Sequence, residues 1–151
     1  MSQTTLYFDD LKVGDSFTTG SYEVSAADIK RFAGEFDPQP FHLDDEAART
    51  TMFGGLAASG WHTAAITMRL LVSGGPKLAN GVLGAGAEIE WKLPARPGDV
   101  LHVESEVVEL TPSRSRTDRG MLVLRSKTIN QHDEVVQILS AKLIVARRPA
   151  N

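Results

Sequence analysis

An acidic and an imidazole side chain stand five residues apart in this chain, as Asp37 and His42. Two prolines lie between them, and each proline ring removes freedom from the backbone. We therefore expect a stiff loop that holds the two side chains in fixed relative positions, which is what general acid–base catalysis needs. A histidine titrates near neutral pH, and a carboxylate beside it can fix its tautomer. Phe36 and Phe41 flank the pair and would supply an apolar wall that excludes water.

A purely structural interpretation of the same residues also stands. An aspartate followed by proline often caps or turns a chain. A histidine between two apolar residues is often a packed core residue whose polar atoms are satisfied. The spacing alone leaves the catalytic and the structural interpretation open.

A second candidate lies where small residues precede a predicted helix, in the run from Ala57 to His62. The first backbone N–H groups of a helix have no partner within the helix and favour negative charge. Gly60 would let a ligand approach the backbone closely. A carbonyl oxygen placed there would gain a donor of the oxyanion-hole type. The alternative is that Ser59 only caps the helix and Gly60 only permits close packing.

Two short helical segments flank the first candidate. Apolar residues at helical spacing predict a helix that follows Ser25, an N-cap residue with Asp28 in the acidic first turn. Pro38 disfavours helical geometry at Asp37 and therefore ends this helix. A second short helix is predicted to begin near Asp44.

A longer helix is predicted from about Ser59 to Val72, where a Gly-Gly-Pro sequence soon follows. One of its faces holds Trp61, Ala64, Ala65, Met68, Leu71 and Val72, and the opposite face holds His62, Ile66 and Arg69. Because this helix is apolar on most sides, we expect it to be deeply buried.

After residue 81 the pattern changes to that of β-strands, which we expect over residues 82–92, 99–110, 121–130 and 134–146. Leu101, Val103 and Val107 share one parity and alternate with polar residues, as in an antiparallel sheet with one buried face. The predicted turns are Pro94 to Asp99, Thr111 to Gly120 and Asn130 to Asp133. This order predicts an α+β domain in which an antiparallel sheet wraps around the long helix. The edge strands of such a sheet could also pair in a dimer.

The composition is that of one soluble globular domain, which we assign to residues 1–151. A net charge of −3 argues against a generic binder of nucleic acid or anionic membrane, which normally carries a basic excess. The absence of cysteine excludes a disulfide scaffold, a cysteine nucleophile and zinc sites built on thiolates. No stretch is apolar enough to span a membrane and no signal peptide is visible, so we expect a cytoplasmic protein.

Three stretches of the chain resemble one known family. The first has an Asp, two intervening positions, then Pro, an apolar residue and His; the second is a small-residue run that ends in Gly; the third is a Pro-Gly-Asp turn. They are the runs Phe32–Asp44, Phe53–Gly60 and Trp91–Asp99. In this combination the chain resembles the MaoC-like dehydratases, which include the R-specific enoyl-CoA hydratases and have the hot-dog fold. The similarity extends from about residue 7 to 147.

The resemblance implies that Asp37 and His42 are the catalytic pair and that the Gly60 N–H binds the thioester carbonyl. It implies the addition of water to a trans-2-enoyl-CoA, which gives the (R)-3-hydroxyacyl-CoA, and the reverse dehydration. Such hydration needs a base that activates water and an acid that protonates the α-carbon. We expect the pair to perform both steps together. The resemblance further implies no metal or redox cofactor, with coenzyme A only as part of the substrate, and a homodimer with the ligand tunnel at its interface.

The chain departs from the family pattern at three positions. Gln39 stands where the family commonly has Asn, and Ser59 stands where many members have His. We take both as candidate substrate-binding residues. Met68 stands where some members have a Ser whose hydroxyl lies near the water. This chain therefore lacks one water-orienting group.

Arginines cluster in the predicted turn before Gly120, as Arg114, Arg116 and Arg119. Arginine is suited to phosphate recognition, and coenzyme A carries phosphates, so these residues are further candidates for substrate binding. The alternative is a solvated loop.

Two other functions fit the same fold. A hot-dog thioesterase also uses a carboxylate and water, so the fold cannot decide between hydration and hydrolysis. A non-catalytic domain that binds acyl thioesters or a partner would use the pocket without turnover. The Asp-x-x-Pro-x-His order favours hydration.

Overall fold

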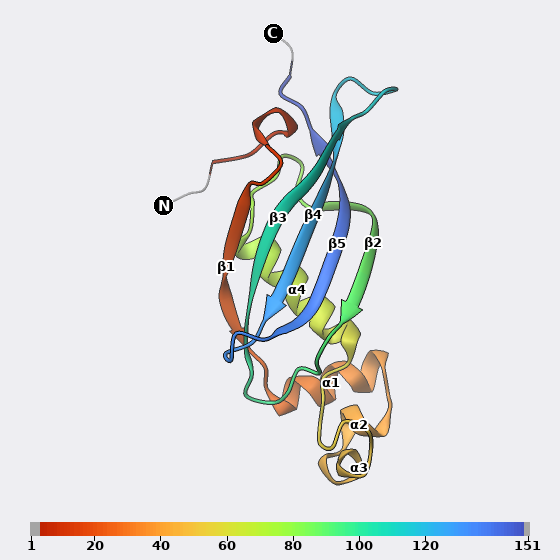
Figure 1. The fold of residues 1–151 in the computed structure, drawn as a ribbon. Coiled ribbons are helices and arrows are strands. Elements are labelled where there is room, and N and C mark those ends of the chain that lie inside the picture. The colour runs from red at the N-terminus through yellow and green to blue at the C-terminus, as the bar shows by residue number, and fades with distance from the viewer. Residues whose placement is uncertain (1–3, 150–151) are drawn as a thin grey trace.

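A five-stranded antiparallel sheet curved around one long helix is the main feature of the fold (Figure 1). The computed structural model describes residues 4–149. The strands are β1 (Ser16–Glu23), β2 (Leu83–Trp91), β3 (Val100–Pro112), β4 (Arg119–Ile129) and β5 (Val135–Ala146). The helices are α1 (Ala26–Phe36), α2 (Pro40–Leu43), α3 (Asp45–Arg49) and the long α4 (Gly60–Gly74), preceded by a 3-10 turn at Phe8–Asp10. The predicted α+β fold, with an antiparallel sheet wrapped around a central helix, is confirmed.

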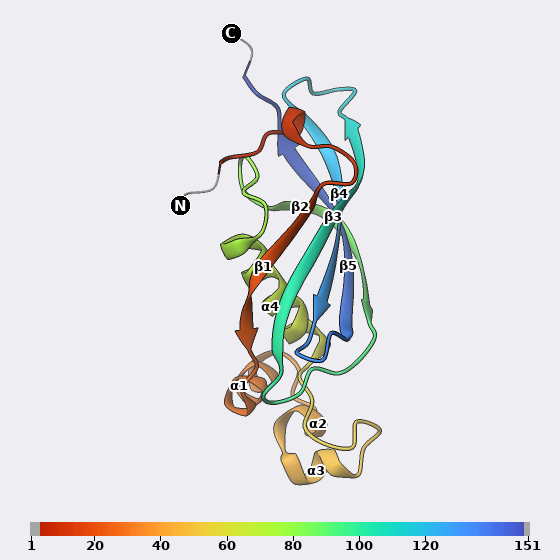
Figure 2. The same ribbon diagram turned by 60° about the vertical axis from the view of Figure 1, so that its left-hand side comes forward.

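The strands lie in the order β1-β3-β4-β5-β2. β2 precedes β3 in the sequence but pairs with β5, so β2 forms one edge of the sheet and β1 the other. The register sets Leu122 of β4 opposite Leu143 of β5. Figure 2 shows the three short helices gathered beyond one end of the strands. That is the end at which α4 begins, so the two candidate segments of the sequence meet there.

Alternating side chains along the strands build the core between the sheet and α4. Leu101, Val103 and Val107 of β3 are fully buried, as their shared parity predicts. Leu101 and Val103 pack in one cluster with Ile66 and Leu70 of α4. Val107 belongs to a second cluster, which packs against the 3-10 turn at the other end of the sheet.

The prediction that α4 is buried on most sides is wrong. The buried residues of α4 are His62, Thr63, Ile66, Thr67, Leu70 and Leu71. Trp61, Met68 and Val72, which the apolar pattern predicts to be buried, are 60%, 42% and 66% exposed. Polar Thr67 can be buried in their stead because its hydroxyl donates to the Thr63 carbonyl and has further partners in the sheet. No helix among the described residues, α4 included, is long and apolar enough to cross a membrane.

The stiff loop predicted around the two prolines is partly helical. Pro40 begins α2, because proline at the start of a helix gives up only an N–H that has no partner there. Pro38 keeps Asp37 outside helical geometry, and α1 ends at the preceding residue. At its other end α1 is capped by Ser25, whose hydroxyl accepts a hydrogen bond from the Asp28 N–H, as predicted.

The predicted turn from Thr111 to Gly120 is shorter than expected, since β3 continues to Pro112 and β4 begins at Arg119. The two strands form a long hairpin that projects at the end of the sheet opposite the short helices (Figure 1). The hairpin therefore stands far from the start of α4 within one chain.

Replacing Leu122 by alanine tests the core. The side chain is fully buried in a central strand, so Leu122→Ala leaves a cavity and we expect a loss of about 2–5 kcal/mol in the free energy of unfolding. Val108→Ala, in exposed β3 surface, is the control and should cost less than about 1 kcal/mol. Urea denaturation measures both, and equal losses would contradict the assignment of the core.

Candidate active site

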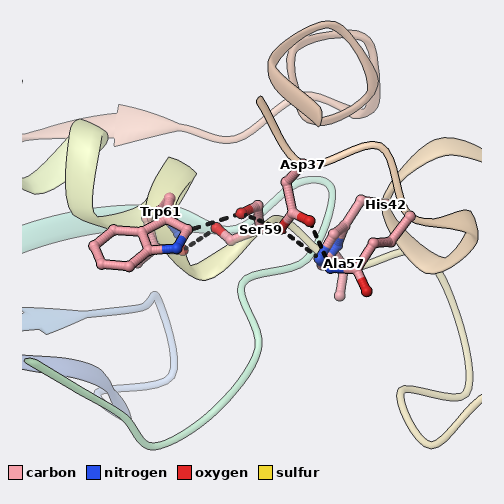
Figure 3. Close-up of polar contacts among 7 residues, drawn as sticks. Asp37, His42, Ala57, Ser59 and Trp61 are labelled. Atoms are coloured by element: carbon pink, nitrogen blue, oxygen red, sulfur yellow. Dashed lines mark hydrogen bonds and ion pairs between the residues drawn. The ribbon is translucent and has the colours of Figure 1, made fainter. Parts of the chain in front are cut away.

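Asp37 and His42 converge at the junction of α1 and α2 (Figure 3). The Nε2 atom of His42 lies 3.3 Å from Oδ2 of Asp37, and the two side chains are 5% and 18% exposed. Asp37 directly follows the last residue of α1, and α2 carries His42, so the turn between the two helices sets the distance. The structure thus brings together the acid and the imidazole that the sequence singles out.

The backbone fixes the tautomer of His42. Its Nδ1 atom lies 2.6 Å from the carbonyl oxygen of Ala57. A carbonyl can only accept, so Nδ1 carries the hydrogen and donates it. In the neutral imidazole Nε2 then presents a lone pair toward the Asp37 carboxylate. Two acceptors that face each other need a shared hydrogen, and a water molecule placed beside both can supply one.

Asp37 is held as a carboxylate by two hydrogen-bond donors. The Ser59 hydroxyl donates to Oδ2 at 2.7 Å, and the Gln39 amide donates to Oδ1 at 2.5 Å. Burial opposes the charge on Asp37, but these two hydrogen bonds and the proximity of His42 outweigh it, so the pKa of Asp37 lies below its usual value. The group is therefore ionised at neutral pH. Gln39 and Ser59, the candidates for substrate binding, both donate to this carboxylate.

The first turn of α4 leaves one backbone donor without a partner. The Trp61 N–H donates to the Ser59 hydroxyl, and the His62 and Thr63 N–H groups donate to the Ser59 carbonyl. No acceptor among residues 4–149 takes the Gly60 N–H. This amide lies at the positive end of α4, where the sequence predicts a donor for a carbonyl oxygen, and that role stays a prediction.

A cavity of about 300 Å³ joins His42 to Gly60. Its other walls include Phe53, Ala58, Thr63, Trp91, Leu93, Pro94 and Ala95. The predicted apolar wall is only half correct, because Phe41 packs edge-on against His42 but Phe36 is 69% exposed at the end of α1. Phe53 takes the place of Phe36, since its ring lies 5.9 Å from that of His42.

Arg96 fixes the segment that holds His42, and the sequence gives no sign of this role. This segment is residues 53–58, and the Arg96 guanidinium donates to three of its backbone carbonyls, those of Phe53, Gly55 and Leu56. The neighbouring Ala95 carbonyl accepts the Ala58 N–H. The Ala57 carbonyl that orients His42 is therefore anchored on both sides. Local spacing could not reveal this, because Arg96 and the segment are about 40 residues apart.

The remaining candidates lie elsewhere. Arg114 and Arg116 are exposed at the hairpin tip, and Arg119, the first residue of β4, pairs with Asp118 in the turn before it. Within one chain the structure does not bring these arginines to the cavity. Met68 is on the exposed side of α4 and does not line the cavity either. Among the described residues, no three His, Asp or Glu side chains gather as metal ligands would.

Comparison with known proteins identifies the family and the fold of the chain. Residues 10–128 match the protein family described as "MaoC like domain". The chain belongs to the MaoC-like family. It is 61% identical to the crystal structure of a MaoC-like dehydratase from Rhodospirillum rubrum, with a TM-score of 0.94 over 96% of this chain and 99% of that one. The hot-dog fold implied by the sequence resemblance is therefore shown.

Two MaoC-like relatives carry names that state a reaction. A 3-hydroxybutyryl-CoA dehydratase from Methylorubrum extorquens is 35% identical over 113 residues, which cover 74% of this chain and 69% of that protein. An (R)-specific enoyl-CoA hydratase from Rhodospirillum rubrum is 28% identical over 139 residues, which cover 87% of this chain and 91% of that protein. Both names describe the gain or loss of water at an acyl thioester.

Removing the Ser59 hydroxyl tests how Asp37 is kept ionised. In Ser59→Ala the first donor is lost, so we expect the pKa of Asp37 to rise from its lowered value. Asp37 would then lose its charge at a higher pH on acidification, and the stability that the charge contributes at neutral pH would shrink. A carbon-13 NMR titration of the carboxyl group measures the midpoint.

The control for Ser59→Ala is Ser25→Ala, since Ser25 caps α1 as Ser59 caps α4 but has no contact with Asp37. Each variant should lose roughly 1 kcal/mol through the missing cap. Only Ser59→Ala should move the titration of Asp37. An unchanged midpoint in Ser59→Ala would contradict the role of this hydrogen bond.

Proposed function

We propose that this MaoC-like protein adds water to trans-2-enoyl thioesters to give (R)-3-hydroxyacyl thioesters, and catalyses the reverse dehydration. The observation that carries the proposal is that Asp37 Oδ2 lies 3.3 Å from Nε2 of His42, and that His42 lines the same cavity as the unpartnered Gly60 amide. The names of the two relatives support the reaction class. No redox or metal cofactor is needed for this chemistry in the proposal.

The proposed reaction begins with a water molecule that donates its hydrogens to Asp37 and His42. The Gly60 N–H binds the thioester carbonyl oxygen and stabilises the enolate-like charge that forms on it. The water oxygen adds to C3 of the substrate as one of its protons passes to the pair. The pair then returns a proton to C2, so the double bond takes up one complete water molecule.

Asp37 suits this role because it is ionised, oriented and poorly hydrated. Its hydrogen bonds with Ser59 and Gln39 hold the carboxylate plane. His42 is oriented by the Ala57 carbonyl, so its Nε2 faces the same point. Such fixed groups lower the barrier because little reorganisation accompanies the proton transfer.

Asparagine at position 37 tests the proposal. Asp37→Asn keeps the shape of the side chain but removes the negative acceptor, and we expect kcat for crotonyl-CoA hydration to fall by roughly 10²–10⁴. Loss of the enoyl absorbance measures the rate. Asp45→Asn, which alters an exposed carboxylate on α3, is the control and should retain activity. An unaffected rate in Asp37→Asn would remove Asp37 from the mechanism.

The same assay separates hydration from thioester hydrolysis. Hydration leaves the thioester intact, whereas a thioesterase releases free coenzyme A. Thiol release from acyl-CoA without consumption of the enoyl bond would favour the thioesterase. Binding of acyl-CoA with neither reaction would favour a non-catalytic domain.

We further propose that two copies of the chain form a homodimer through β2 and α4. β2 is an edge strand whose residues are mostly exposed, so its outer backbone groups can pair with another strand. Beside it, Trp61, Ala65, Met68 and Val72 form an exposed stripe along α4. A second copy can cover this stripe with its own, since antiparallel pairing of two β2 strands creates a twofold axis.

A charge placed in the α4 stripe tests the dimer. Met68→Glu should weaken self-association at least tenfold, because the carboxylate would be buried in the interface. Sedimentation velocity at micromolar concentration should show a dimer for the natural sequence and a shift to monomer for the variant. Val13→Glu, at another exposed apolar position, is the control. A natural sequence that sediments as a monomer would contradict the proposal.

A further inference from the structure

A chain of buried polar side chains runs beneath α4 and ends at the cavity. The Trp91 indole Nε1 donates to Oε1 of Gln137 at 2.9 Å, and Nε2 of Gln137 donates to the Thr67 hydroxyl at 3.0 Å. The Thr67 hydroxyl is also 2.6 Å from that of Thr128. Gln137, Thr67 and Thr128 are fully buried. Buried polar groups are destabilising unless their hydrogen bonds are made, so the positions of these four side chains are closely constrained.

Only one arrangement of hydrogen atoms satisfies all the hydrogen bonds of this buried network. An indole N–H can only donate, which fixes the oxygen of Gln137 toward Trp91 and its NH₂ group toward Thr67. The Thr67 hydroxyl gives its hydrogen to the Thr63 carbonyl, 3.0 Å away, and accepts from both Gln137 and Thr128. A rotation of the Trp91 ring would leave the Gln137 oxygen buried without a donor. The core therefore holds the ring in place.

The ring so held lies directly against Gly60. A Cβ atom built on Gly60 would fall 2.5 Å from Cε2 of Trp91, so only glycine permits this approach. Trp61 packs edge-on against the same ring, with 5.2 Å between centroids. Trp91 and His42 line the same cavity. The indole thus stands beside the amide to which the proposed function assigns the thioester carbonyl.

We infer that Trp91 limits the length of the acyl chain and that Gln137 is the positioning residue that keeps it there. The inference rests on the proposed function, because that function places an acyl thioester in this cavity. The cavity is small, about 300 Å³, and the indole is the bulkiest of its walls next to Gly60. An acyl chain that extends from the thioester carbonyl along this wall contacts the indole ring of Trp91. Short acyl groups are therefore the preferred substrates.

The test compares a short and a long acyl chain in two independent measurements. The first is the ratio of kcat/KM for trans-2-octenoyl-CoA to that for crotonyl-CoA. The second is the ratio of the affinities for octanoyl-CoA and butyryl-CoA, measured by calorimetry, which needs no turnover. Trp91→Ala should raise both ratios at least tenfold, since the four additional carbons of the longer acyl chain would enter the space of the ring.

The role of Gln137 is tested by removing either end of its bond to Trp91. Trp91→Phe loses the indole N–H and Gln137→Leu loses its acceptor, and each should raise the two ratios roughly threefold to tenfold. In Trp91→Phe the bond is already absent, so adding Gln137→Leu should not raise the ratios further. A merely structural role of Gln137 would weaken short and long substrates alike and leave the ratios unchanged. Trp91→Phe removes a donor to the buried Gln137 oxygen but replaces a side chain that is itself 45% exposed, so this arm holds even where Gln137→Leu fails to fold.

Val108→Ala, at an exposed position of β3 that does not line the cavity, is the control and should change neither ratio more than about twofold. Unchanged affinity ratios in Trp91→Ala would overturn the inference, as would a natural protein that binds neither saturated acyl-CoA. A shift of the affinity ratio without any hydration by the natural protein would support the inference and refute the proposed function.

Discussion

The hydrogen bond from His42 to the Ala57 carbonyl decides what this site can do. Because the carbonyl takes the Nδ1 hydrogen, the atom that faces Asp37 is a lone-pair acceptor in the neutral ring. With a hydrogen on the other nitrogen, His42 would donate directly to Asp37 and the two groups would satisfy each other. The pair would then have no need of a water molecule. One backbone oxygen therefore leaves, in the neutral ring, two acceptors that face each other instead of a donor and an acceptor.

That carbonyl belongs to a segment with no regular structure, yet it is fixed from several directions. Arg96 binds the carbonyls before it, Ala95 binds the amide after it, and Phe41 accepts the Ala57 N–H itself. These anchors come from the turn between β2 and β3 and from α2. The same turn contributes walls to the cavity. The walls of the cavity and the orientation of His42 thus depend on the same group of contacts.

The sequence predicts the strands and the proximity of Asp37 and His42 better than it predicts what surrounds them. Period-two alternation identifies the buried residues of β3, and the spacing around the prolines brings Asp37 to His42. Both signals are local, so a short window of sequence contains them. The exposed side of α4 is missed because apolar residues are taken as buried, whereas Thr67 is buried through hydrogen bonds to Thr128 and Gln137, about 60 and 70 residues away. The role of Arg96 is missed for the same reason, because the carbonyls that it binds are about 40 residues away in the sequence.

Ser59 shows why the structural and functional interpretations need not compete. As an N-cap its hydroxyl accepts the Trp61 N–H, and this geometry turns the side chain toward the open end of α4. The cap uses the hydroxyl only as an acceptor, so its hydrogen is free to be donated to Asp37. The helix start that exposes the Gly60 amide therefore also delivers the donor that keeps the carboxylate ionised. The helix cap and the bond to the carboxylate share one atom, Oγ of Ser59, which accepts from the Trp61 N–H and donates to Oδ2 of Asp37. A side chain at position 59 that lacks either a donor or an acceptor must therefore lose one of these two hydrogen bonds.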